Sequence, residues 1–219
     1  MSAHTRGPSI AVSDAAAPPL HRPAMSSSEP EHLLYLVRAH TGSLHDALDA
    51  RLQPDGAPMA QARYTAFLRA TSAIALPLEL PLAIHLGPLV VRERAGERRA
   101  RLAHDLELLG SSLAEPWPAL PVIESAADAF GAAYVLLGSH LGGEVIARRL
   151  FGRDAGPATP TSYARLYGPD LGPMWTRFTD ALVVFGGAHD AMVRRHVAAV
   201  AVALFTAFGL ALDREGVPR

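Results

Sequence analysis

The feature that most constrains this chain is a predicted helix over residues 134–150 that contains three interior glycines. Its sequence has helical periodicity, yet Gly138, Gly142 and Gly143 all lie within it. Each glycine inside a helix costs about 1 kcal/mol relative to alanine, so other contacts must compensate for roughly 3 kcal/mol. We therefore expect something to approach this backbone more closely than a side chain would allow.

Two of these glycines belong to a stripe along one face of the predicted helix. Gly138 and Gly142 share that face, and Gly131 lies almost in line with them two turns earlier. Either another helix crosses tightly at the stripe, or a flat ligand lies on the bare backbone. The glycines alone leave both interpretations open.

A second predicted helix, residues 34–52, places a histidine on an apolar face. His45 shares this face with Leu34, Thr41 and Leu52, and with Arg38 two turns before it. A lone histidine in such a position is commonly a core residue whose nitrogens are satisfied. A ligand role for His45 therefore needs support from elsewhere in the chain.

The two segments together resemble the heme oxygenase family. In that family the first helix carries a proximal histidine in a Thr-x-x-x-His pattern, which is matched here by Thr41 and His45. The distal helix carries Gly-x-x-x-Gly-Gly, which is matched by residues 138–143. The sequence of residues 134–143 is especially similar to that of the biliverdin-producing bacterial branch, which is often found beside bacteriophytochromes. The resemblance covers roughly residues 30–212.

The resemblance implies an all-α, single-domain helical bundle with heme between the first helix and the glycine-rich distal helix. It implies oxidative opening of heme to biliverdin, carbon monoxide and ferrous iron, using O2 and electrons from a separate ferredoxin- or flavodoxin-type donor. Heme is then both substrate and cofactor. His45 is the expected iron ligand, and Gly138 and Gly142 are expected to lie over the macrocycle. The resemblance also implies a cytoplasmic enzyme whose biliverdin serves a bacteriophytochrome.

The two residues that follow Gly138 are Ser139 and His140. Many family members carry an aspartate directly after the first glycine, where it organises water, whereas this chain has Ser139. A hydroxyl positions a water but is not a charged acceptor. The branch named above also tends to carry serine, so the resemblance still implies a catalytic role for Ser139. His140 lies about 160° around the helix from Gly138, and we expect it to point sideways or away, toward solvent.

Cations are expected at the mouth of a heme site, where they pair with the propionates. Arg38 lies about 10 Å along the helix axis from His45, which suits an iron-to-propionate separation. Arg177 lies where the family places basic residues on a later helix. A solvated surface position is the alternative for both arginines. Thr41 and Gly143 complete the expected heme-binding set.

Composition excludes several other classes of protein. The chain has 219 residues, of which 49% are hydrophobic, and its net charge of −1 gives no electrostatic case for binding nucleic acid. It has no cysteine, which excludes disulfides, cysteine nucleophiles and thiolate-ligated heme. The apolar run 197–212 spans sixteen residues, fewer than the ~20 that cross a bilayer. We therefore expect a buried last helix and no membrane partner.

We expect the chain to divide into a disordered tail over residues 1–28, a helical domain over 29–213 and a C-terminal tail over 214–219. Prolines and glycines separate the predicted helices, and Pro77 and Pro81 are expected to kink or end the second one. No convincing strand is predicted. Besides residues 34–52, the predicted helices cover about 60–86, 97–110, 123–150, 162–185 and 190–212.

Two rival functions remain. The first is a protein of the same fold that stores, senses or transfers heme without degrading it, and Ser139 keeps this alternative open. The second is a non-heme member of related helical folds, such as the thiamin-degrading or quinone-forming bundles. The absence of cysteine counts against the thiamin version.

Overall fold

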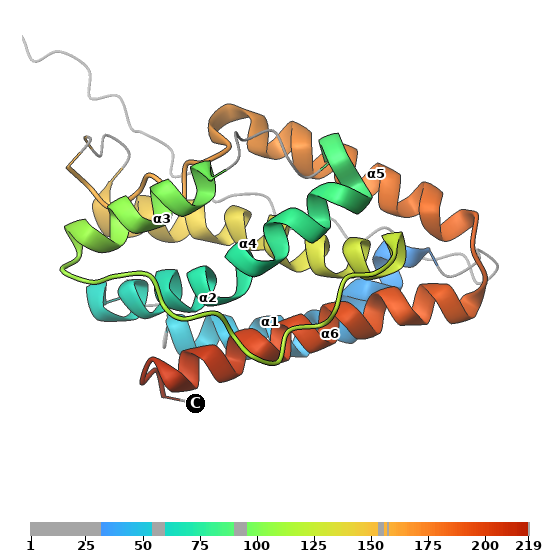
Figure 1. Cartoon of the computed structure of the whole chain (residues 1–219), viewed down its shortest axis with the longest axis horizontal. Coiled ribbons are helices and arrows are strands. Elements are labelled where there is room, and N and C mark those ends of the chain that lie inside the picture. The colour runs from blue at the N-terminus through green and yellow to red at the C-terminus, as the bar shows by residue number, and fades with distance from the viewer. Residues whose placement is uncertain (1–31, 54–59, 90–95, 153–155, 157, 219) are drawn as a thin grey trace, which may run out of the picture. The chain divides into compact units, whose positions relative to one another are not determined.

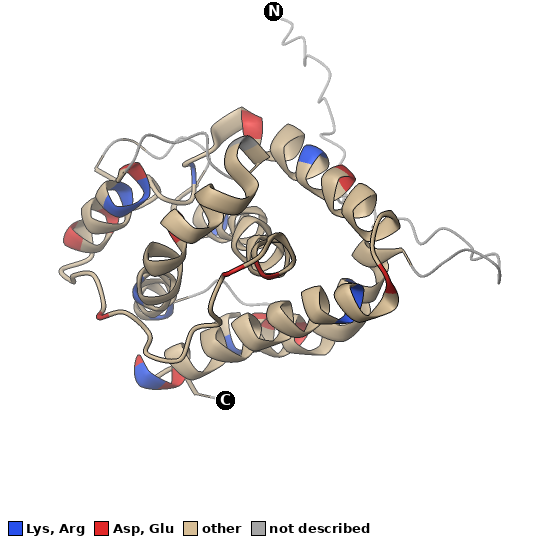
Figure 2. Cartoon of the chain, turned by 45° about the vertical axis from the view of Figure 1, so that its right-hand side comes forward, with Lys and Arg blue, Asp and Glu red and all other residues tan. Residues whose placement is uncertain are grey.

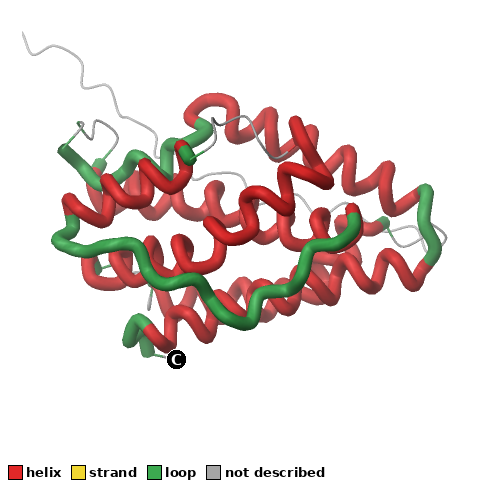
Figure 3. Tube along the Cα trace, viewed as in Figure 1, coloured by secondary structure: helices red, strands yellow, loops and turns green. Residues whose placement is uncertain are grey.

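The computed structural model describes residues 32–53, 60–89, 96–152, 156 and 158–218. No strand occurs in these ranges, which confirms the all-α prediction (Figure 3). The predicted tail over residues 1–28 lies outside them. The helices are α1 (Leu33–Leu52), α2 (Gln61–Leu86), α3 (Glu97–Leu108), α4 (Ala126–Phe151), α5 (Leu171–Gly187) and α6 (Ala191–Arg214), with short 3-10 turns η2 (Gly87–Leu89) and η3 (Gly168–Asp170).

Helix α6 packs against α1, α2 and α4 and contributes much of the core (Figure 1). Val197, Ala201 and Leu204 on this helix are fully buried. One face of the apolar run 197–212 is therefore buried in the core, whereas the opposite face, which includes Leu210 at 43% exposure, is exposed. The helix itself has 24 residues and is longer than that run, because it begins at an Asp190 N-cap whose carboxylate accepts from the Val193 N–H at 3.0 Å.

Three helices, α2, α4 and α6, are long and apolar enough to cross a membrane when only length and composition are considered. In this fold 56%, 61% and 50% of their apolar windows, respectively, are buried against other helices. Packing within the bundle thus accounts for about half of this apolar surface. The expected absence of a membrane partner stays a prediction.

Helix α2 continues through Pro77 and Pro81 and bends partway along its length, as expected of a proline inside a helix (Figure 1). Pro77 has no N–H to donate to the carbonyl of Ala73 four residues earlier. The Trp117 N–H donates to that carbonyl instead, at 3.0 Å. The irregular segment 110–124 is therefore fastened along α2 at the kink (Figure 3).

Two helix crossings depend on glycine. A Cβ at Gly131 of α4 would lie 2.5 Å from the Val197 carbonyl oxygen and 2.8 Å from the Val200 Cβ, both on α6. A Cβ at Gly186 of α5 would collide with the side chain of Leu33 on α1. At both places the missing side chain lets two helices approach closely.

The helix predicted over residues 162–185 begins only at Leu171, which corrects its start. The buried carboxylate of Asp105 on α3 accepts hydrogen bonds from the backbone N–H groups of Ser162 and Tyr163, at 2.9 and 2.7 Å. These bonds hold residues 162–167 as turns against α3. Periodicity does not reveal this, because the partner carboxylate lies far away in the sequence.

Residues 215–218, which we expected to follow the domain as a tail, pack back toward α1. Val217 is buried, and Arg51 in the last turn of α1 donates to the carbonyls of Gly209, Val217 and Pro218. Arg51 also forms an ion pair with Asp213 at 2.7 Å. One guanidinium thus joins the end of α1 to the end of α6.

Basic and acidic residues are interspersed along the helices in Figure 2, in keeping with the net charge of −1. Some form pairs one turn apart on one helix, such as Arg101 with Glu97 at 2.7 Å and Arg148 with Glu144 at 2.8 Å. The expectation that the chain binds no nucleic acid stays a prediction.

The crossing at Gly131 predicts a large effect of adding one methyl group. Gly131→Ala should lower the free energy of unfolding by about 1–3 kcal/mol, because the new Cβ forces α4 away from α6. Gly142→Ala is the matched control on the same helix. Its Cβ meets nothing within 4 Å, so helix propensity should stabilise that variant by up to about 1 kcal/mol.

Urea denaturation of the three ligand-free proteins measures both effects. Equal destabilisation by the two substitutions would contradict the distinction between Gly131 and Gly142.

Candidate functional site

His45 lies at the edge of the buried face of α1. Its side chain is 58% exposed, whereas Thr41 and Leu52 on the neighbouring part of the helix are 2% and 5% exposed. The edge of its ring meets the ring of Phe205 on α6, with centroids 6.1 Å apart. The interpretation of His45 as a satisfied core residue is therefore wrong.

One nitrogen of His45 faces a carboxylate and the other does not. Nδ1 lies 3.4 Å from Oδ2 of Asp49, one turn further along α1. Burial is the main cause that raises the pKa of Asp49, and the nearby His45 lowers it. We assign the proton of neutral His45 to Nδ1, where the carboxylate favours it. Nε2, for which the described residues provide no hydrogen-bond partner, then carries the free lone pair.

The glycine stripe on α4 divides between the two interpretations that the sequence left open. Gly131 serves the crossing with α6. At Gly142 an added Cβ would meet nothing within 4 Å, and at Gly138 only the indole ring of Trp175, at 3.7 Å. Gly143 would meet only the Phe67 ring, at 3.9 Å. Gly142 is therefore exposed, Gly138 is half-buried beside Trp175, and Gly143 is buried.

Contacts between helices place His45 and Gly138 at a similar level of the bundle. Helices α1, α4 and α6 run in the same direction (Figure 1). Gly138 lies seven residues after Gly131, and Phe205 lies five residues after Val200, which Gly131 contacts. These separations correspond to about 10 and 8 Å along the two axes. Because His45 meets Phe205, both His45 and Gly138 lie on the same side of the α4–α6 crossing.

The contact between α5 and α1 gives a second, independent comparison of positions along the bundle. It runs opposite to α1 (Figure 1), and the two helices meet where Leu33 contacts Gly186. His45 lies twelve residues after Leu33, and Trp175 lies eleven residues before Gly186. Both separations are about 17 Å. His45 on α1, Trp175 on α5 and Gly138 on α4 therefore border the same level of the bundle.

Ser139 is half-buried, and its hydroxyl donates to the Leu136 carbonyl at 2.8 Å. With its only proton committed to the helix backbone, Ser139 has acceptor lone pairs left for another group. Thr41, the other hydroxyl predicted for the site, is similarly occupied, because it donates to the Val37 carbonyl at 2.8 Å.

The two predicted arginines occupy different surroundings. Arg38 is exposed on α1, and within the described part of the chain it has no ion-pair partner. Its position two turns before His45 leaves it available to an anionic group near α1. Arg177 is also exposed, but on α5 it is about 200° around the helix from Trp175. The structure therefore does not bring Arg177 together with Gly138.

His140 is buried, so the expectation that it faces solvent is wrong. It is 1% exposed and lies between the rings of Tyr163 and Tyr167, with centroids 4.6 and 4.7 Å away. Neither of its ring nitrogens has a hydrogen-bond partner among the described residues. The predicted angle from Gly138 was sound, but that side of α4 is also covered. Its apolar neighbours Ala133 and Leu136 were the sequence signal for this second buried face.

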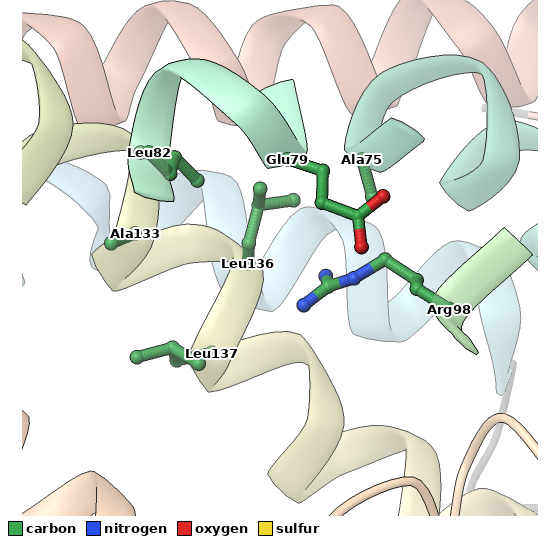
Figure 4. Close-up of a pocket in the computed structure, with 7 residues that line it drawn as sticks. All are labelled: Ala75, Glu79, Leu82, Arg98, Ala133, Leu136 and Leu137. Atoms are coloured by element: carbon green, nitrogen blue, oxygen red, sulfur yellow. The ribbon is translucent and has the colours of Figure 1, made fainter. Parts of the chain in front are cut away.

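The back of α4 also borders a small cavity with room for about one water molecule. Arg98 and Glu79 point toward one another there, and Leu136 lies beside them (Figure 4). A second cleft of about 470 Å³ lies near the start of α4, between Phe185 and His196. Neither His45 nor the glycines of the stripe line these two cavities.

No protein-family profile and no curated protein matches this chain.

Burial of His140 predicts a loss of stability in acid. Desolvation, and secondarily the charge of Arg98, lower its pKa well below the ordinary value of 6.5. The unfolded chain thus binds a proton as the pH falls below about 6.5, while the folded protein does not. Lowering the pH from 7.5 to 5.5 should cost up to about 1.4 kcal/mol of unfolding free energy through this residue.

Urea denaturation at the two pH values measures this effect, and His140→Leu should reduce the pH dependence by that amount. Val145→Ala on the exposed side of α4 is the control, because it changes no titratable group. An identical pH dependence in wild type and His140→Leu would contradict the prediction.

Proposed function

We propose that this protein is a heme oxygenase that binds heme between α1 and α4 and opens it to biliverdin, carbon monoxide and ferrous iron. The observation that carries the proposal is the pairing of a histidine with a free Nε2 and an uncovered glycine backbone at one level of the bundle. His45 provides the first feature, and Gly142 provides the second, with Gly138 one turn before it covered only by the Trp175 ring. The sequence resemblance supplies the reaction.

The residues fit a planar iron-containing substrate. Helix α1 packs mainly on α6 and α5, and α4 is not among its principal neighbours. A neutral imidazole is a good ligand for heme iron, and Asp49 beside Nδ1 favours the tautomer in which Nε2 binds metal. Bare backbone at Gly142 admits a flat ring where a side chain would exclude it.

When bound, heme supplies both the iron that activates O2 and the carbon skeleton that is opened. The residues of the chain then have separate tasks. His45 holds the substrate through Nε2, and Asp49 retains the proton at Nδ1. Arg38 pairs with a propionate at the exposed edge. Ser139 accepts a hydrogen bond from a water near the ring, since its own hydroxyl proton is donated to the Leu136 carbonyl.

The wider context is proposed from the resemblance alone. Electrons come from a separate ferredoxin- or flavodoxin-type donor, and the reaction takes place in the cytoplasm. Biliverdin then becomes the chromophore of a phytochrome-type photoreceptor.

One observation favours a second candidate, a heme carrier or sensor without turnover. Ser139 stands where many heme oxygenases have aspartate, and its hydroxyl is bound to the helix backbone. A carrier needs no residue that organises water for proton delivery. Adding ascorbate in air to the hemin complex separates the two functions. Loss of the Soret band with growth of biliverdin absorption supports the oxygenase, whereas a stable Soret band supports the carrier.

The ligand assignment predicts a large effect at one of two histidines on the same helix. His45→Ala should abolish the five-coordinate hemin spectrum or weaken binding by about 100-fold, because iron loses its protein ligand. Asp49→Asn should weaken binding by about 10-fold through the orientation of His45. Absorbance titration with hemin measures both.

His40→Ala is the matched control, because His40 is exposed on the same helix and its Nδ1 contacts only the Leu36 carbonyl. If His45→Ala gave the wild-type spectrum, His45 would not be the ligand. If the wild-type protein gave no hemin band, the proposal that it binds heme would be wrong.

A further inference from the structure

The uncovered backbone of α4 is walled on one side by a single aromatic ring. The atoms nearest to a Cβ at Gly138 are Cη2 and Cζ3 of Trp175, at 3.7 and 3.8 Å. One turn further along, Gly142 has no neighbour within 4 Å. The space along the glycine stripe is therefore asymmetric, closed by an indole at Gly138 and open at Gly142.

Aromatic neighbours hold the indole in this position. Its ring lies 5.7 Å from that of Tyr134 on α4 and 5.8 Å from that of Phe178 on α5. Phe178 is fully buried, and Met174 beside Trp175 is 1% exposed. A large planar side chain with few rotatable bonds, packed on two sides, forms a rigid wall. Trp175 itself is half-buried, so part of its surface is available for contact.

The position of this wall matters for a substrate with distinguishable edges. Heme is nearly square, but its propionates and its apolar substituents occupy different edges. The guanidinium of Arg38 selects the propionate edge only coarsely, since a flexible exposed arginine tolerates several positions. A fixed indole beside Gly138 excludes those in-plane orientations that place a peripheral substituent against it.

We propose that Trp175 determines the in-plane orientation of heme and thereby which bridging carbon is opened. This inference rests on the proposed function, because it requires heme on the glycine stripe. Trp175 makes no link to iron. It selects among orientations by contact with the edge of the substrate, while His45 fixes the distance from α1.

Two substitutions at Trp175, with a matched control, test the proposal in the full-length protein reconstituted with hemin. Trp175→Ala removes the wall, and Trp175→Phe retains an aromatic ring of smaller area. Trp117→Phe removes the other tryptophan of the chain, which lies on segment 110–124 beneath the Arg214 guanidinium. Hyperfine-shifted heme-methyl NMR signals of the ferric cyanide complex give the ratio of in-plane orientations without turnover.

In Trp175→Ala the ratio of orientations should change by about threefold or more, while hemin affinity stays within about tenfold of wild type. Trp175→Phe should change the ratio in the same direction and by less, and Trp117→Phe should leave it unchanged. After reduction in air, the mixture of biliverdin isomers should follow the NMR ratio.

A Trp175→Ala protein that binds hemin with the wild-type ratio overturns the role of Trp175 and leaves the proposed function intact. If Trp175→Ala does not fold, the same comparison with Trp175→Phe decides the matter. Absence of hemin binding by the wild-type protein overturns both the proposed function and this inference.

Discussion

The backbone contact between α4 and α6 at Gly131 sets the geometry on which the rest of the structure depends. With no side chain between them, the Val197 carbonyl and the α4 backbone approach closely. This crossing fixes how far along α6 each later turn of α4 lies. Helix α1 is positioned on α6 in turn, because His45 contacts Phe205 and Arg51 donates to the Gly209 carbonyl. The level at which His45 lies relative to Gly138 is thus set by a contact that lies seven residues before Gly138 on α4 and five residues before Phe205 on α6.

Two sides of helix α4 differ in their surroundings. One side carries the glycine stripe, and the other carries His140 packed between two tyrosines. The polar groups on this second side hold α3 and the turns before α5 together, through Asp105 and through the bond from Arg98 to the Tyr167 hydroxyl at 2.8 Å. The proposed chemistry needs only the first side. The second side stabilises the helix that presents it.

Much of the fold could be predicted from the sequence, because helical periodicity and proline or glycine punctuation are local signals. The helices near residues 34–52, 60–86 and 190–212 follow from them. The division of the glycine stripe could not be predicted, since it depends on which helix meets each turn. The turns at residues 162–167 depend on a distant carboxylate. The angle of His140 around α4 does not predict its burial, because that angle says nothing about what covers that side of the helix.

The brace formed by Arg51 has a practical meaning for how the molecule can be altered. One guanidinium binds carbonyl groups at Gly209, Val217 and Pro218, so hydrogen bonds join the end of α1 to residues 215–218. A fluorophore or affinity tag fused directly after Pro218 therefore acts on the helix that carries His45, although its attachment point belongs to the other end of the sequence. A label intended to leave the proposed iron ligand undisturbed belongs elsewhere, for example on the exposed start of α6 near Met192.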